Sequence, residues 1–398
     1  MLYHRWLETL RRFSNRPAIY DEERVFTFSD LALAVSDAPI ADGPVIARGG
    51  SIYFFIEILR AWRSGQAVIP VERDAPEPVL RCPPPASTCL VKYTPGAAGI
   101  PRGIFFTDAQ VIADGDRLVS AMQLEPETPN LAVISLAHSY GFSNVVLPLI
   151  LHGVPIHLAP LPFPRVIEGI FKKHPQWVVP AVPSMWRAWQ RAGILKGAPI
   201  SLALSAGAPL TLALEAEVFV AAGLKIRNFY GSSECGGISM DLSDIPRSSA
   251  SDVGTPLAGV QVTRTDEGRF CIESRSVAIG YDAPRADDVL GNGIYLTRDV
   301  GFLDAQGKLH LTGTLGGAIN VAGRKVSPAK VEAALIATGL VRRARVYGMT
   351  SSDSERCEEI AAEIVLSEGV SLDFLKSAAS GTLQNWELPR HWRIMTGH

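Results

Sequence analysis

Short runs rich in β-branched and aromatic residues alternate with stretches of helical periodicity over more than half of this chain of 398 residues. The runs Val154–Leu158 and Trp177–Pro180, for example, flank the helical stretch Arg165–His174. Strands that alternate with helices bury their apolar faces as sheets covered by helices. The sequence therefore predicts an α/β protein whose large N-terminal domain contains several sheets.

The pattern of predicted secondary structure changes after Asp252. Short strands and glycine-rich turns follow, and beyond Gly313–Gly317 two helices and two strands form an independent α+β pattern. We expect a β-rich subdomain followed by a small, mobile α+β C-terminal domain. The expected domains are 1–313 and 314–398, joined by a glycine-rich segment whose backbone should rotate freely.

Charge and cysteine content exclude several functional classes. The 38 Lys and Arg residues against 40 Asp and Glu residues give a net charge of −2, so no global field favours nucleic acid. The five cysteines are dispersed and form no CxxC pair, which argues against a disulfide framework or a zinc site and favours a cytoplasmic setting. Residues 131–164 lack Asp, Glu, Lys and Arg, but His, Asn, Pro and Gly interrupt them, so we expect no membrane span.

A loop of small residues between two predicted strands is the first candidate site. Its segment Tyr93–Gly103 reads YTPGAAGIPRG, whereas the motifs GxxxxGK[ST], HExxH and GxSxG are absent. Small residues let backbone N–H groups approach a phosphate closely, and glycine allows a positive φ. Because such loops are also common as plain turns, the neighbouring segments decide between the two interpretations.

Two further segments carry side chains suited to a nucleotide. The segment Tyr230–Glu234 follows the strand Lys225–Phe229, and its tyrosine can stack on a base while its carboxylate holds a cation. The segment Gly293–Asp299 ends on an aspartate that can accept both ribose hydroxyls. Open α/β sheets bind ligands at the carboxyl ends of their strands, so these segments indicate a nucleotide site.

In this order, the segments resemble the adenylate-forming superfamily (the AMP-dependent synthetase and ligase family), which includes acyl-CoA synthetases, aryl-CoA ligases, peptide-synthetase adenylation domains and luciferases. Six stretches match family motifs: Tyr93–Gly103 (YTSGTTGxPKG), His138–Gly141 (HxxG), Ser205–Leu210 (SGGAPL), Tyr230–Glu234 (YGxTE), Tyr295–Thr314 (YxTGDxGxxDxxGxLxxxGR) and Ile319–Glu332 (IKxxGxKVxPxxVE). The resemblance covers nearly the whole chain and implies the fold of that family, with its large N-terminal and small rotating C-terminal domains.

The resemblance also implies a function. The chain would activate an acyl or aryl acid as an acyl-AMP and pass the acyl group to CoA, or to the phosphopantetheine thiol of an acyl carrier protein supplied in trans. ATP or AMP and Mg²⁺ are the implied cofactors, and a small carboxylic acid is the implied substrate. Transfer to the thiol would follow rotation of the small domain.

Each implied role falls on particular residues of this sequence. The nucleotide would contact Thr94, Gly96, Ala97, Ala98, Gly99, Gly207, Ala208, Pro209, Tyr230, Gly231, Ser232, Ser233 and Asp299. Glu234 would hold Mg²⁺ and, with His138, would be catalytic. The acyl pocket would involve His138, Gly141, Gly207 and Gly236, and the thiol tunnel Gly323, Arg324 and Lys325.

The sequence departs from the family pattern where the family holds the triphosphate. The loop hydroxyls give way to Pro95, Ala97 and Ala98, the loop lysine to Arg102, the arginine of the GR motif to Thr314, and the IK lysine to Asn320. The LPxTxxGK loop, with the lysine that bridges the carboxylate and the α-phosphate, does not follow Leu388, so we expect an atypical member without this lysine. Losing one preorganised charged donor costs about 3–4 kcal/mol of transition-state stabilisation, so we expect weakened adenylation from ATP.

Two functional hypotheses stay open at this point. The chain is either an acid–thiol ligase, or a non-adenylating relative that binds or processes an acyl-AMP or acyl-thioester made elsewhere. Pyrophosphate exchange separates the two.

Individual side chains have alternative interpretations as well. His138 either gates the acyl pocket or is a hydrogen-bonded histidine at a buried helix start, and Cys235 fits an inert thiol better than a reactive one. The segment Arg342–Arg345 fits a solvated charged loop better than a contact to a CoA phosphate or an acidic carrier protein.

Overall fold

The computed structural model describes residues 1–22, 24–94, 101–315, 319–321, 324–350 and 358–395. The chain divides into two compact units. The first consists of Met1–Ser248, Val253–Val262 and Ile272–Leu296, and the second of Ser249–Asp252, Thr263–Cys271 and Thr297–His398. The domain boundary expected at residues 313 and 314 lies inside the second unit.

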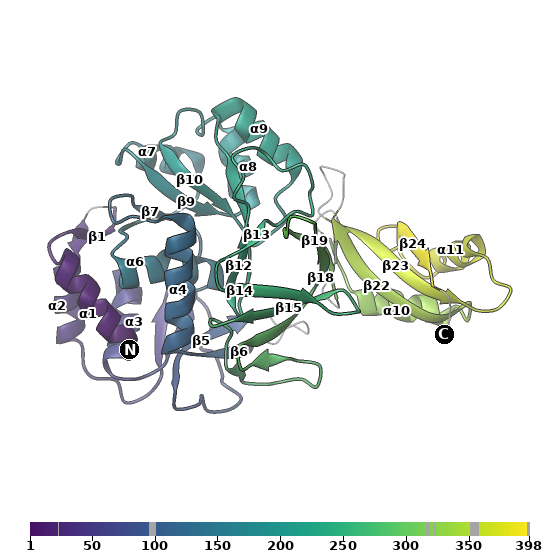
Figure 1. Cartoon of the computed structure of the whole chain (residues 1–398), viewed down its shortest axis with the longest axis horizontal. Helices are drawn as coiled ribbons and strands as arrows, with labels where there is room; N and C mark the ends of the chain where they lie inside the picture. Colours follow the sequence, from purple (N-terminus) through teal and green to yellow (C-terminus); the bar gives the residue numbers. More distant parts are fainter. Residues whose placement is uncertain (23, 95–100, 316–318, 322–323, 351–357, 396–398) are drawn as a thin grey trace. The chain divides into compact units, whose positions relative to one another are not determined.

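A nine-stranded sheet in the order β13-β12-β11-β10-β9-β7-β8-β1-β2 forms the centre of the first unit (Figure 1). Its strands are β1 (Pro17–Tyr20), β2 (Val25–Thr27), β7 (Asn130–Ala132), β8 (Ile156–Leu158), β9 (Trp177–Ala181), β10 (Ile200–Ser205), β11 (Ile226–Ser232), β12 (Gly236–Met240) and β13 (Thr255–Pro256). Six consecutive strands of this sheet run parallel to one another: β11, β10, β9, β7, β8 and β1. Their carboxyl ends therefore meet at one edge of the sheet.

A second sheet of the first unit has the order β16-β6-β5-β4-β3. It is made of β3 (Val45–Arg48), β4 (Val68–Val71), β5 (Thr88–Thr94), β6 (Arg102–Thr107) and β16 (Gly280–Tyr281). The helices of this unit are α1 (Leu2–Phe13), α2 (Phe28–Asp37), α3 (Ile52–Arg63), α4 (Asp108–Met122), α5 (Ser139–Gly141), the π-helix η1 (Phe142–Val146), α6 (Leu147–His152), α7 (Pro164–Phe171), α8 (Pro183–Arg191) and α9 (Leu212–Ala222).

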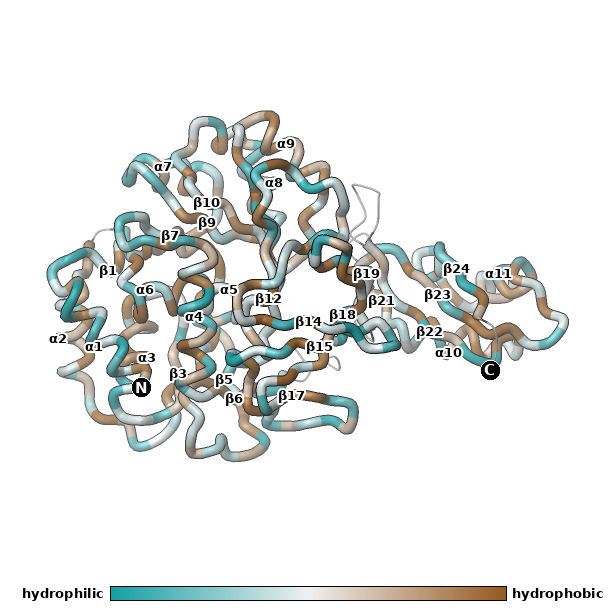
Figure 2. The backbone as a smooth tube through the Cα atoms, viewed as in Figure 1, coloured by the Kyte–Doolittle hydropathy of each residue, from teal (hydrophilic) through white to brown (hydrophobic). Residues whose placement is uncertain are grey.

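Amphipathic helices cover these sheets with large apolar side chains. Trp186 and Trp189 of α8 pack with Leu214 and Val218 of α9 against the central strands of the nine-stranded sheet. Each such side chain that leaves water contributes about 1.5–3 kcal/mol. Hydrophobic and hydrophilic residues alternate along most of the chain (Figure 2).

The uncharged stretch of the sequence is folded inside the first unit. It forms β7, the continuous helical run α5–η1–α6 and β8, close to the expected strand, loop, helix and strand. Among the described residues, no helix is long and apolar enough to cross a membrane.

The second unit has its own apolar core. Its remaining elements are β18 (Ile294–Leu303), which it shares from Thr297 onward, β19 (Leu309–Thr314), β20 (Ile319–Val321), β21 (Arg324–Val326), α10 (Pro328–Ala337), β22 (Val341–Thr350), β23 (Glu358–Leu366), α11 (Leu372–Ser380) and β24 (His391–Ile394). Val331 and Leu335 of α10 and Leu375 of α11 pack on the sheet β22-β23-β24. Strands β14 (Val260–Arg264), β15 (Arg269–Ser274) and β17 (Leu290–Gly291) complete the chain.

The expectation of free rotation at Gly313 is corrected by the structure. Gly313 belongs to β19 and pairs with Val300 of β18. A Cβ atom at Gly313 would lie 2.2 Å from the carbonyl oxygen of Gly348, so close packing explains the glycine. Gly316 and Gly317, the other two glycines of the predicted hinge, lie outside the described residues.

Candidate functional site

Two of the segments predicted from the sequence meet at the carboxyl edge of the nine-stranded sheet. The exposed loop Gly207–Pro209 follows β10, and Tyr230 lies near the end of β11. The two strands are neighbours in register, with Ser205 opposite Asn228. Gly207 has a φ of +80°, which explains why glycine occupies this sharp exit from the strand. A base held by this loop and Tyr230 would bind at the edge where α/β sheets take ligands.

A buried ionic network anchors the exposed loop. Leu210, the residue after the loop, is buried, and its carbonyl oxygen accepts a hydrogen bond of 2.6 Å from Arg247 Nη2. Arg247 Nε donates to Glu215 Oε2 at 2.8 Å. Lys225 completes the network by pairing with Glu215 and, at 2.5 Å, with Asp241. This network could not be predicted from the sequence, because its members come from four separate segments.

Glu234, the candidate cation ligand, lies in the tight turn between β11 and β12. Its backbone N–H donates to Ser232 Oγ at 3.2 Å, and Tyr281 donates its hydroxyl to Glu234 Oε1 at 2.9 Å. Burial and the Glu234 charge raise the pKa of Tyr281, so its hydroxyl remains a proton donor. Gly231, Ser232, Ser233 and Glu234 are at least partly exposed to solvent, as a binding turn requires.

Helix α4 supports the far side of this turn. Asp114 Oδ1 accepts hydrogen bonds from Gly237 N at 3.1 Å and from Arg117 Nη2 at 2.9 Å. A Cβ atom at Gly236 would lie 2.1 Å from Asp114 Oδ1, and Gly236 has a φ of +73°. The predicted acyl-pocket residue Gly236 therefore packs directly against the Asp114 carboxylate.

Hydrogen bonds from the segment that contains Ser274 and Ser276 also support the backbone next to Glu234. Ser276 Oγ donates to the carbonyl oxygen of Cys235 at 2.6 Å, and Arg117 Nη1 donates to Ser274 Oγ at 2.8 Å. Burial raises the pKa of Cys235 to about 12, so this thiol stays protonated at neutral pH.

The predicted phosphate loop is described only at its two ends. Thr94 is half-buried at the end of β5, and Gly96, Ala97, Ala98 and Gly99 lie outside the described residues. Arg102, at the position of the family lysine, pairs with Asp288 at 2.5 Å and lies 3.7 Å over the centre of the Tyr281 ring. Its guanidinium therefore contacts Asp288 and the Tyr281 ring within the protein.

The helical run α5–η1–α6 begins beside the same sheet edge. Tyr140 stacks on Phe229 of β11 with ring centres 5.9 Å apart. A Cβ atom at Gly141 would lie 2.0 Å from the carbonyl oxygen of Ser135, so the glycine of the HxxG motif allows close packing.

His138 is the N-cap residue of α5, so it lies at a helix start as expected. It is not buried: its side chain is 67% exposed, and Nε2 lies 3.3 Å from Glu72 Oε1. The alternative of a buried histidine is therefore corrected.

The predicted ribose ligand belongs to the second unit. Asp299 lies in β18 opposite Thr314 of β19, and Thr314 Oγ1 donates to Asp299 Oδ1 at 2.7 Å. The hydroxyl of Thr297 donates to the backbone carbonyl of Asp299 at 2.9 Å. Both contacts fix the carboxylate on the hairpin.

Two of the three predicted thiol-tunnel residues lie in β21. Arg324 and Lys325 have strand backbone in β21, paired with Val321 and Asn320 of β20. Gly323 lies outside the described residues. Arg345 of β22 lies 3.7 Å from Glu363, which reduces the positive charge that this strand presents.

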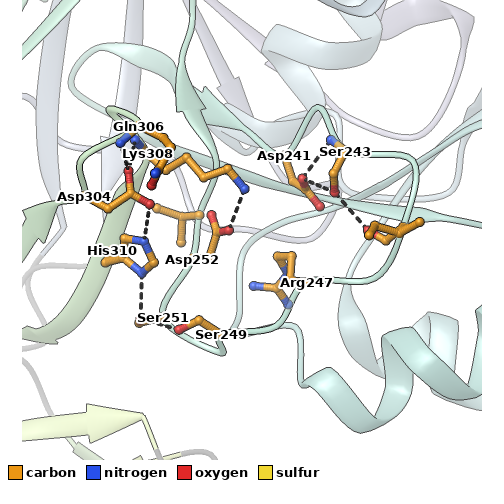
Figure 3. Close-up of polar contacts among 12 residues, drawn as sticks. Asp241, Ser243, Arg247, Ser249, Ser251, Asp252, Asp304, Gln306, Lys308 and His310 are labelled. Atoms are coloured by element: carbon orange, nitrogen blue, oxygen red, sulfur yellow. Dashed lines mark hydrogen bonds and ion pairs between the residues drawn. The ribbon is translucent and has the colours of Figure 1, made fainter.

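A polar cluster in the second unit joins a serine, a histidine and an aspartate (Figure 3). His310 Nδ1 lies 3.0 Å from Ser251 Oγ, and His310 Nε2 lies 3.1 Å from Asp304 Oδ2. Asp304 Oδ1 also accepts two backbone N–H groups, from Gln306 and Lys308, at 2.9 Å each. These bonds fix the turn between β18 and β19 and hold it to the segment Ser249–Asp252.

The residues at the carboxyl edge of the nine-stranded sheet fit a magnesium ion bound through one protein carboxylate. Among the described residues, no group of three or more His, Cys, Asp and Glu side chains could hold a metal ion by itself. Mg²⁺ is commonly bound through one or two carboxylates together with substrate phosphates. Glu234 offers one such carboxylate at the sheet edge, beside Tyr230.

Comparisons with known proteins identify a family and a fold. Residues 54–281 match the sequence model of the family described as AMP-binding enzyme. The chain is 24% identical over 355 residues to 4-coumarate–CoA ligase-like 9 of Oryza sativa subsp. japonica, covering 80% of this chain and 61% of that protein. It is also 24% identical over 331 residues to the long-chain-fatty-acid–CoA ligase of Bacillus subtilis (strain 168), covering 78% of this chain and 59% of the ligase. The chain thus spans about 60% of the length of these curated relatives.

Solved structures share the fold over nearly the whole chain. ATP-bound MatB from Rhodopseudomonas palustris superposes with a TM-score of 0.70 at 16% identity, covering 99% of this chain and 95% of that one. The o-succinylbenzoate CoA synthetase of Bacillus subtilis, in complex with its acyl-adenylate intermediate, gives a TM-score of 0.69 at 17% identity, covering 98% and 94%. The expected multi-sheet α/β fold with a small C-terminal sheet is confirmed.

Proposed function

Because the chain belongs to the AMP-binding enzyme family, we propose that it is an acid–thiol ligase that activates a carboxylic acid as an acyl-AMP. The acyl group then passes to a thiol, that of CoA or of a phosphopantetheine on a carrier protein. The observation that carries the proposal is the meeting of Gly207–Pro209, Tyr230 and Glu234 at the carboxyl edge of parallel strands.

The roles of the residues follow from their chemistry. The backbone of Gly207–Pro209 and the Tyr230 ring bind the adenine. The ribose role of Asp299, which belongs to the second unit, is a prediction from its sequence motif. Glu234 holds Mg²⁺, which supplies positive charge beside the nucleotide phosphates. His138 and Gly141 border the acid, whose carboxylate oxygen attacks the α-phosphorus and displaces pyrophosphate.

We further propose that adenylation is the slower half-reaction. Family hydroxyls and lysines that contact the triphosphate are replaced in this sequence, and the Arg102 guanidinium is paired with Asp288. Charge that develops on the phosphates therefore meets fewer preorganised donors. Thioester formation needs mainly an acyl-AMP held by its adenosine.

The relatives of this chain indicate which acceptor to test first. They are CoA ligases, which supports CoA over a carrier protein as the first thiol. The acid itself is open, so a panel of aryl, short-chain, long-chain and dicarboxylic acids is required.

ATP–pyrophosphate exchange with this panel tests the proposal. Exchange that depends on one class of acid and on Mg²⁺ is the expected result. Binding of AMP without exchange for any acid would replace the ligase by the non-adenylating alternative.

A further inference from the structure

The Glu234 carboxylate has one oxygen engaged by a residue distant in sequence. Tyr281, 47 residues further along the chain, donates its hydroxyl to Oε1 at 2.9 Å. We propose that Tyr281 is a positioning residue that holds Oε1 and thereby presents the other carboxylate oxygen to the nucleotide-bound cation. The inference rests on the proposed function, because it concerns the same cation.

The Tyr281 ring is itself held rigidly. The residue is 9% exposed, and its backbone in β16 pairs with Ile104 of β6. The Arg102 guanidinium lies 3.7 Å over the ring centre, in the geometry of a cation–π contact. These contacts hold the phenolic oxygen within hydrogen-bond distance of Glu234 Oε1.

Arg102 is held in turn by a carboxylate on its other side. Asp288 receives Arg102 Nη1 at 2.5 Å and Nη2 at 3.4 Å. Asp288 Oδ2 also accepts the backbone N–H of Arg285 at 2.7 Å. Asp288, Arg102, Tyr281 and Glu234 are therefore linked by consecutive side-chain contacts within the first unit.

The chemistry of magnesium explains why this chain of contacts matters. Mg²⁺ demands near-ideal octahedral geometry and loses water reluctantly, so a ligand that swings freely binds it poorly. Hydrogen bonds that orient a ligating side chain change metal affinity by about 10–100-fold when they are removed. Tyr281 supplies such a bond to Glu234 Oε1 at 2.9 Å.

The test compares Tyr281→Phe with the wild-type chain in calorimetric titrations of ATP at increasing Mg²⁺ concentrations. We expect the Mg²⁺ concentration for half-maximal ATP binding to rise about tenfold. AMP binding without Mg²⁺ should stay unchanged, because the phenol does not contact the adenosine in this account. The matched control is Tyr347→Phe, which removes a tyrosine hydroxyl that lies 3.4 Å from Glu363 in the second unit.

A double-mutant cycle separates positioning from general loss of structure. In a Glu234→Ala background, Tyr281→Phe should change Mg²⁺ dependence no further, because its target carboxylate is gone. Thermal melting of each variant shows that it is folded.

The outcomes distinguish the inference from the proposed function. Wild-type protein that binds no ATP at any Mg²⁺ concentration would end the proposed function, and the inference with it. Wild-type protein that binds ATP with Mg²⁺ while folded Tyr281→Phe shows the same Mg²⁺ dependence would overturn the inference alone.

Discussion

The hydroxyl of Thr314 donates a hydrogen bond of 2.7 Å to Oδ1 of Asp299, and the two residues face each other across the hairpin of β18 and β19. Thr314 stands where the related motif carries an arginine. A short neutral hydroxyl thus orients the aspartate. The role of Asp299 as the ribose ligand is a prediction from its sequence motif.

Replacing this carboxylate should abolish nucleotide binding. We expect Asp299→Ala to remove AMP binding in isothermal titration calorimetry, because two charge-assisted hydrogen bonds are lost together. The control is Asp266→Ala, at an exposed residue between β14 and β15. AMP affinity that is equal in Asp299→Ala and the wild type would show that the ribose binds elsewhere.

The turn that carries Glu234 should tolerate no side chain at Gly236. Gly236→Ala should destabilise the fold by more than Gly259→Ala, although both positions have a positive φ, of +73° and +76°. The backbone alone costs alanine about 1–2 kcal/mol at either position. Only Gly236 adds a Cβ atom 2.1 Å from Asp114, whereas nothing lies within 4 Å at Gly259. Equal losses in urea unfolding would contradict the packing of α4 against this turn.

The buried ionic network should depend on each of its charges. Lys225→Met leaves Asp241 without its 2.5 Å partner in an interior position and should cost about 3 kcal/mol of unfolding free energy. Lys172→Met is the matched control, because Lys172 is 73% exposed in its pair with Glu168. The control should change stability by less than about 0.5 kcal/mol. A comparably small effect at Lys225 would mean that the network is not needed for folding.

Acid should destabilise the first unit through His157. Burial, with the nearby charges of Lys173 and His174, lowers the pKa of His157 to about 4 from its usual 6.5. Between these values the unfolded chain binds a proton at His157 and the folded chain does not. Stability from this residue is therefore present above pH 6.5 and falls progressively as pH drops to 4, by about 3 kcal/mol in total.

Denaturant unfolding at several pH values measures this effect. His157→Phe keeps a ring beside Tyr20 and Trp177 and should flatten the loss of stability between pH 6.5 and 4. His4→Phe, at an exposed position on α1, should leave the pH profile unchanged. Parallel profiles for the wild type and His157→Phe would exclude His157 as the source.

Local sequence signals predicted the elements well. Thr107 and Gln110 have capping-box spacing in the sequence, and α4 begins there with both hydrogen bonds of the box present. The strands predicted at Val154–Leu158 and Trp177–Pro180, and those on both sides of the phosphate loop, also lie close to where their patterns placed them. These features depend on residues a few positions apart, which is the range over which hydrophobic pattern and capping chemistry act.

The supports of the candidate site were not predictable in the same way. Arg102 matched a family lysine, yet its partner Asp288 is 186 positions away, and Gly237 meets Asp114 across 123 positions. No local pattern encodes such contacts. The apolar run Leu131–Leu136 does not form one strand: β7 ends at Ala132, and the N–H of Val133 donates to the carbonyl oxygen of Leu131 at 3.0 Å.

Single-turnover kinetics of the two half-reactions test the account most directly. Preformed acyl-AMP is mixed with CoA or a carrier protein in one arm, and acid with ATP and Mg²⁺ in the other. For the acid that supports pyrophosphate exchange, we predict that the thioester forms from acyl-AMP faster than acyl-AMP forms from the acid and ATP. Adenylation from ATP that outpaces thioester formation would contradict the weakened phosphate contacts, and the absence of both reactions with every acid would contradict the ligase itself.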